Sequence, residues 1–144
     1  MSTSLPESES LAPQLSLSAK ARLAARIWRS WVRVRLGVRT EALPELATRL
    51  GRSGPRAVPA QPPERLSRAV YRSLRFGPRR PSCLTSALVL FCLLREQGDN
   101  AELVIGLPAQ PVDHEAHAWV ELEGIDVGPP PGRGQCTAMA RFSS

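Results

Sequence analysis

The chain has 144 residues, which is enough for one domain with a real hydrophobic core and too few for two large domains. Its formal net charge of +6 comes almost wholly from arginine, because Lys20 is the only lysine. No apolar run could span a bilayer, the first residues lack the pattern of a secretory signal, and three irregularly spaced cysteines argue against a disulfide framework. We therefore expect a cytoplasmic protein without a membrane partner.

The first half of the chain predicts helices. Residues 1–15 are rich in Ser, Pro and Glu, and we expect them to be a disordered tail. Residues 16–77 should form a helical N-terminal portion. Its first helix carries arginines on one face and apolar residues at helical spacing on the other, namely Leu23, Ile27, Trp31, Val34 and Val38.

Two shorter helices follow. Thr40 can cap a helix that runs through Leu50, and a Pro/Gly-rich connector comes next. The third helix places Leu66, Val70 and Leu74 on one stripe.

The basic first helix has several uses. Arginine suits carboxylate, phosphate or nucleic-acid partners, although the bias could equally reflect the base composition of the genome. A basic amphipathic helix can also lie on a membrane surface, but its large apolar residues favour packing against a core or a partner. The apolar surface around Trp28 and Trp31 is a plausible docking site for a partner protein.

Residues 78–144 change in character and begin with an apolar helix. Ser82 marks its start and Gly98 its C-terminal cap. Cys83 then falls in the first turn, where unpaired backbone N–H groups and the positive end of the helix dipole stabilise a thiolate and can face an oxyanion. Cys92 lies in the middle of the same helix and fits a buried structural role.

Two strands are expected after this helix, in AELVIGL and AHAWVELEG. On the second, His117, Trp119 and Glu121 share one face, and alternation does not decide which face meets the core. His114 lies in a polar loop and should be solvated. A metal site built from the two histidines has weak support, and Cys136 lies in a loop-like tail without a partner.

A Cys at a helix start followed by a His on a strand is the arrangement of papain-like and transglutaminase-like cysteine enzymes. The chain resembles the lasso-peptide leader peptidase, the transglutaminase-like half of the lasso-peptide maturation B protein, over roughly residues 64–142. The segments that carry the resemblance are CLTSALVLFCLLREQGDNAELVIGL, AHAWVELEG and DVGPPPGRG. The resemblance implies an α+β, transglutaminase-like/papain-like cysteine peptidase core without a cofactor or metal. It also implies Cys83 as nucleophile, His117 as base and an Asp on the following strand as third residue.

Asp126 is the natural candidate for that third residue, and Glu123 is the second. A tight turn at Glu123 and Gly124 would pair Asp126 with Glu121, about 13 Å along the strand from His117. A turn centred at Glu121 and Leu122 would instead bring Asp126 opposite His117. The sequence leaves both open.

The resemblance implies that the substrate is a lasso-peptide precursor, from which the leader is cut before a separate ATP-dependent cyclase acts. The helical first half lacks the strand-rich look of the leader-recognition domain, so a separate recognition protein is expected as a partner. Two alternatives stand beside this reading. One is a catalytically inactive scaffold of the same fold that holds a peptide or a partner, and the other, supported only by net charge, is a basic regulatory protein on nucleic acid.

Overall fold

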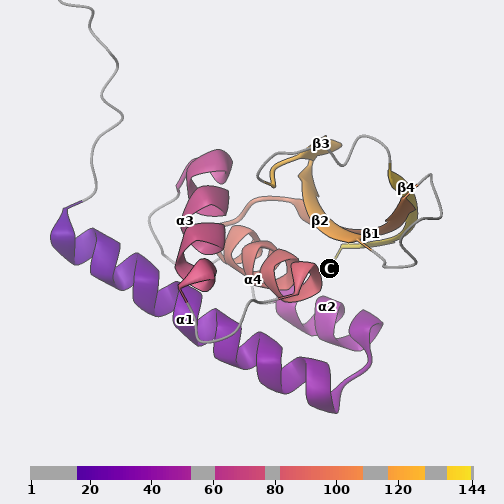
Figure 1. Ribbon diagram of the computed structural model, residues 1–144, viewed down its shortest axis with the longest axis horizontal. Coiled ribbons are helices and arrows are strands. Elements are labelled where there is room, and N and C mark those ends of the chain that lie inside the picture. The colour runs from indigo at the N-terminus through magenta and orange to yellow at the C-terminus, as the bar shows by residue number, and fades with distance from the viewer. Residues whose placement is uncertain (1–15, 53–60, 77–81, 109–116, 129–135, 144) are drawn as a thin grey trace, which may run out of the picture.

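The computed structural model describes residues 16–52, 61–76, 82–108, 117–128 and 136–143 (Figure 1). Helices come first in the chain: α1 (Leu17–Thr40), α2 (Leu43–Gly51), α3 (Pro63–Arg75) and α4 (Cys83–Glu96). Strands follow: β1 (Ala101–Pro108), β2 (His117–Leu122), β3 (Ile125–Asp126) and β4 (Cys136–Phe142). The α+β architecture expected from the sequence is confirmed. The predicted tail at residues 1–15 lies outside the described residues.

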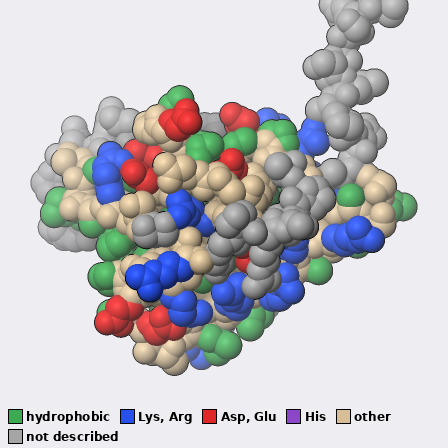
Figure 2. All heavy atoms as spheres, turned by 180° about the vertical axis from the view of Figure 1, so that it is seen from behind, with side chains coloured by type: hydrophobic (Ala, Val, Ile, Leu, Met, Phe, Trp, Pro, Cys, Tyr) green, Lys and Arg blue, Asp and Glu red, His purple; other side chains and the backbone are tan. Residues whose placement is uncertain are grey.

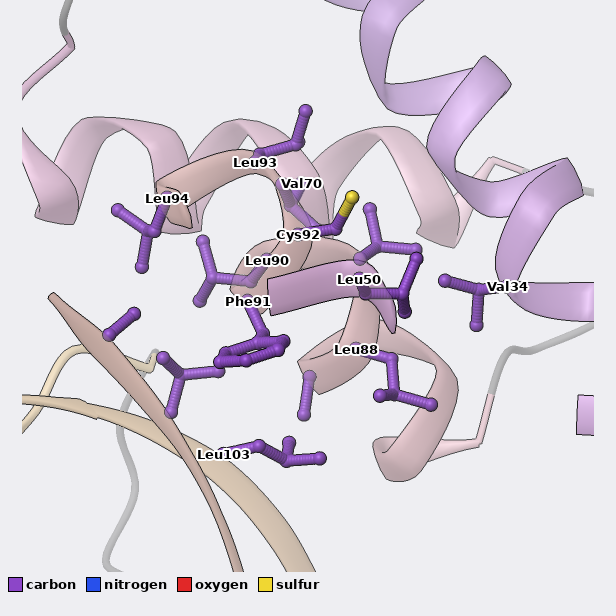
Figure 3. Close-up of a cluster of buried hydrophobic side chains, with 14 of the residues drawn as sticks. Val34, Leu50, Val70, Leu88, Leu90, Phe91, Cys92, Leu93, Leu94 and Leu103 are labelled. Atoms are coloured by element: carbon purple, nitrogen blue, oxygen red, sulfur yellow. The ribbon is translucent and has the colours of Figure 1, made fainter. Parts of the chain in front are cut away.

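Helix α4 occupies the centre of the molecule. Helices α1, α2 and α3 pack on it from one side, and β1 and β2 pack on it from the other (Figure 1). Every residue from Thr85 to Leu94 is buried, since this helix is apolar all round and not only along a stripe. In Figure 3, Phe91 points from α4 toward β1, which carries Leu103. One hydrophobic core therefore joins the helical half to the sheet.

Both ends of α4 use capping groups that the sequence predicts. The Ser82 hydroxyl accepts a hydrogen bond from the backbone N–H of Thr85 at 3.2 Å, which makes Ser82 the N-cap. After the last turn, Gly98 takes a positive φ of 96°. The N–H groups of Gly98 and Asp99 reach back to the carbonyls of Arg95 and Leu94, which is a Schellman motif.

The first three helices agree with the sequence except at one junction. Ile27 and Val34 of α1 are buried, as predicted, but Val38 is 44% exposed, because the buried stripe of α1 continues through Gly37, which packs against Leu46 of α2. The Thr40 hydroxyl donates to the carbonyl of Leu36 at 3.0 Å within α1. The prediction that Thr40 caps the second helix is thus wrong, and the N-cap of α2 is Ala42, which makes no side-chain cap.

The third helix matches its prediction. The buried face of α3 contains the predicted stripe of Leu66, Val70 and Leu74, together with Ser67. The domain boundary expected between residues 77 and 78 lies outside the described residues. On either side of it, the elements share the core around α4.

The four strands form one antiparallel sheet in the order β3-β2-β1-β4. β2 and β3 are joined by a tight turn at Glu123 and Gly124, which have φ values of 53° and 81°. β4 corrects the expectation that Cys136 lies in a loop-like tail, because Cys136 is its first residue and pairs with Pro108. The sheet register shifts between Ile105 and Gly106, where β4 approaches so closely that a Cβ on Gly106 would lie 2.6 Å from the Thr137 carbonyl oxygen.

The structure decides which face of β2 meets the core. Ala118 and Val120 join the hydrophobic cluster around α4. By alternation, His117, Trp119 and Glu121 belong to the opposite face. Trp119 is nonetheless only 4% exposed, since its ring covers Gly106 on the neighbouring strand.

Across the described ranges, no helix is both long enough and apolar enough to cross a membrane.

Candidate active site

Cys83 is the first residue of α4, as the sequence predicts, and it is exposed. The first N–H groups of an α-helix have no acceptor within the helix. At α4, the Ser82 hydroxyl takes the N–H of Thr85 and the Ser82 carbonyl takes that of Ser86 at 3.1 Å. The helix start therefore offers a reachable thiol beside the positive end of a helix dipole, which suits a nucleophile.

Cys92, nine residues further along α4, has the opposite surroundings. It is fully buried, and its thiol donates a hydrogen bond to the Glu96 carboxylate at 3.8 Å. Burial, and then the negative charge of Glu96, raise the pKa of the Cys92 thiol to about 11. The burial of Cys92, predicted from its place in the apolar helix, is confirmed.

His117 opens β2 and is half-buried, with Gly106 of β1 as its partner across the ladder. Residues 97–100 alone connect α4 to β1, and α4 packs on both β1 and β2, so the chain reverses direction between the helix and the sheet. The start of β2 pairs with the end of β1. The first turn of α4 and the first residue of β2 consequently lie toward the same end of the helix–sheet layer. By alternation, however, His117 belongs to the face of β2 that is turned away from α4, so the described backbone does not bring its side chain to Cys83.

Asp126 is positioned by the β2–β3 turn. It pairs with Glu121, so the first of the two turns considered from the sequence is the one observed. In this register the level of Asp126 is four residues from His117 along β2, or about 13 Å. Its carboxylate accepts the backbone N–H of Gly128 at 2.7 Å. Glu123 is exposed in the turn itself, at the other end of β2 from His117.

Sequence reasoning missed a polar network on the same face of the sheet as His117. The Glu121 carboxylate accepts hydrogen bonds from the Trp119 indole N–H at 2.9 Å and from Arg141 at 2.6 Å. Burial alone would raise the pKa of Glu121, but the hydrogen bonds from Arg141 and Trp119 outweigh it and hold the pKa below its usual value. Arg141 also contacts Glu102 at 3.4 Å, so the network spans β2, β1 and β4.

Only part of this network could be predicted from the sequence. Alternation puts Trp119 and Glu121 on one face, but Arg141 belongs to the strand that the sequence did not predict.

Two residues considered from the sequence remain outside this geometry. His114 lies outside the described residues, and only the backbone pairing of Cys136 is described. Among the side chains that the structure describes, no group of three or more His, Cys, Asp or Glu residues could hold a metal ion.

Comparison with known proteins gives a family. Residues 27–141 match the family described as "Transglutaminase-like superfamily", which includes cysteine peptidases and transglutaminases. The match begins within α1 and ends within β4, so it takes in the helical half as well as the sheet. Neither the curated proteins nor the solved structures gave a match. With a Cys at the start of its central helix and a His at the start of the following hairpin, the chain belongs to the transglutaminase-like superfamily.

Proposed function

We propose that the protein is a cysteine peptidase that removes the leader from a lasso-peptide precursor in the cytoplasm. The observation that carries the proposal is the exposed Cys83 thiol at the capped start of α4, in a chain of the transglutaminase-like superfamily. The resemblance of CLTSALVLFCLLREQGDN and AHAWVELEG to the leader peptidases supplies the substrate.

In the proposed reaction, His117 takes the proton of Cys83 and the thiolate attacks the carbonyl carbon at the junction of leader and core. Backbone N–H groups at the start of α4, at the positive end of the helix dipole, stabilise the negative charge that develops on the carbonyl oxygen. The C–N bond then breaks, and His117 gives its proton to the leaving amine of the core peptide. Water hydrolyses the thioester that remains, which releases the leader and restores the thiol.

The proposed partners come from the resemblance to the leader peptidases. The first is a leader-recognition protein that presents the precursor. The lasso cyclase is proposed as a second partner, since it consumes the new N-terminus.

The test is mass spectrometry of a cognate precursor incubated with the protein and its recognition partner. We expect release of the leader by the native protein, and an intact precursor with Cys83→Ala and with His117→Ala. Release by Cys83→Ala at the native rate would refute the assignment of the nucleophile.

The observed turn favours a second candidate, an inactive scaffold of the same fold. With Asp126 paired to Glu121, the carboxylate proposed to orient the imidazole is displaced along the strand from His117. A precursor that binds but stays intact with the native protein and both variants would select this candidate. If the enzyme is active, Asp126→Asn separates the two roles: an unchanged rate removes Asp126 from the triad, whereas a loss supports it.

A further inference from the structure

A groove runs between α1 and α3, and neither Cys83 nor His117 lines it. It encloses about 400 Å³ and its floor is apolar, formed by Leu23, Ala24, Ile27 and Ala69. Such a hollow can take one or two large apolar side chains from a segment laid along two helices.

The rim of the groove is strongly basic. Four cationic side chains line it: Lys20 of α1, and Arg65, Arg68 and Arg72 of α3. No acidic residue is among its described lining residues. Lys20, Arg68 and Arg72 form no ion pair with a carboxylate in the described part of the chain.

The surrounding surface has the same sign. Helix α1 contains seven basic residues and no acidic one. Seen from behind, Lys and Arg side chains gather over the lower half of the molecule, where α1 lies in both views (Figure 2). Two basic residues of α1, Arg26 and Arg33, are directed to the buried Glu96. Lys20, Arg68 and Arg72 have no such counter-charge among the described residues.

We propose that this groove binds an acidic peptide segment of another protein, with a large apolar side chain on the floor and carboxylates against the rim. The apolar floor distinguishes this occupant from nucleic acid, whose phosphates would use the rim but leave the floor uncovered. The inference does not depend on the chemistry of Cys83.

The test measures fluorescence anisotropy of a labelled 14-residue synthetic peptide that has Leu at every third or fourth position and Glu between. The protein is the full chain carrying Cys83→Ala, so that cleavage cannot obscure binding. Two control peptides replace every Glu by Lys or every Leu by Ser. We expect the Glu/Leu peptide to bind at least about tenfold more tightly than either control, with an affinity that falls as salt is added.

Two pairs of variants locate the site. Arg68→Glu with Arg72→Glu should weaken binding about tenfold or more, whereas Arg29→Glu with Arg39→Glu makes the same change in net charge on exposed positions outside the groove and should have little effect. Ala24→Phe should fill the groove and block binding, whereas Ala25→Phe, at the exposed next position, should not. Circular dichroism confirms that each variant is folded.

Three results would overturn the proposal. One is equal binding of the Glu and Lys peptides. Another is an equal loss in both charge-reversal pairs, which would reduce the effect to net charge. The third is tighter binding of a duplex DNA oligonucleotide than of the peptide, with a DNA affinity that falls in both charge-reversal pairs. That result would make the surface a phosphate-binding one.

Discussion

Two cysteines on one helix differ in chemistry because their neighbours differ. Cys83 lies exposed at the start of α4, and Cys92 lies in the core with its thiol on the Glu96 carboxylate. Thiolate is the reactive form of cysteine, so the raised pKa and the burial of Cys92 make its thiol inert, whereas the Cys83 thiol is accessible to reagents. Glu96 itself is buried and held by Arg26 and Arg33 of α1, at 3.6 and 3.5 Å.

The contrast can be measured by alkylation with iodoacetamide at pH 8. Cys92 is studied in a Cys83→Ser, Cys136→Ser variant, where it is the remaining thiol. Because its pKa rises from 9.0 to about 11, its thiolate population falls about a hundredfold, and burial slows access further. We expect labelling in the native state at least about a hundred times slower than in urea. Similar rates in both states would contradict the burial of Cys92.

At the scale of elements, Glu121 ties three strands together. Through Arg141 it connects β2 to β4, and through the Trp119 indole it fixes the ring that covers Gly106 of β1. These contacts help to hold β4 in the sheet, because β4 lies at an edge and, among the described strands, pairs only with β1.

Replacing Glu121 by Gln should therefore lower the free energy of unfolding by about 1–2 kcal/mol at pH 7. The pKa of Glu121 is lower in the folded state than its ordinary value of 4.5, so its stabilisation is present above that pH and is lost as the pH falls through the folded value. Urea unfolding at several pH values should show the native protein and the variant converging in acid.

Glu102→Gln is the matched control. Its ion pair with the same Arg141 is exposed on both sides and should contribute little. A pH-independent difference for Glu121→Gln would show that the charge of Glu121 does not matter.

The same strands show how far the sequence could lead. Local patterns were enough for α4, since Ser82 and Gly98 cap it and its apolar run is long, and for β2, where the residues alternate. β4 was missed because its residues gain their partner only from β1, about 30 positions earlier in the chain. The face of β2 that meets the core was equally undecidable, because Trp119 is large and apolar yet covers Gly106 on the other face.

The candidate site could be predicted only where it depends on local features of the sequence. The place of Cys83 depended on one helix start, which is a local feature. The relation of Asp126 to His117 depended on the position of a turn, and two positions fitted the sequence. The observed turn gives Glu123 a positive φ, which is uncommon for a residue other than Gly, so its residue type gave no reason to expect the turn there.

For the whole molecule, α4 contributes more buried residues than any other described element. Phe91 is fully buried in α4 and points toward the sheet, so Phe91→Ala should cost about 3–5 kcal/mol, a large part of the total stability of a domain. Leu36→Ala on α1 is the control, because Leu36 is 60% exposed and should change stability by less than about 0.5 kcal/mol. Urea midpoints measure both. Equal effects would mean that the core is not centred on α4.

The burial of α4 on both sides also governs how the gene can be divided. A fragment that begins after α3 would present the side of α4 that normally meets α1, α2 and α3 to water, and such an apolar surface promotes aggregation. A fragment that ends at α3 would leave Leu66, Val70 and Leu74 uncovered in the same way. The two pieces should be recoverable only when they are expressed together, so the helix that carries Cys83 cannot be transplanted without the helices that precede it.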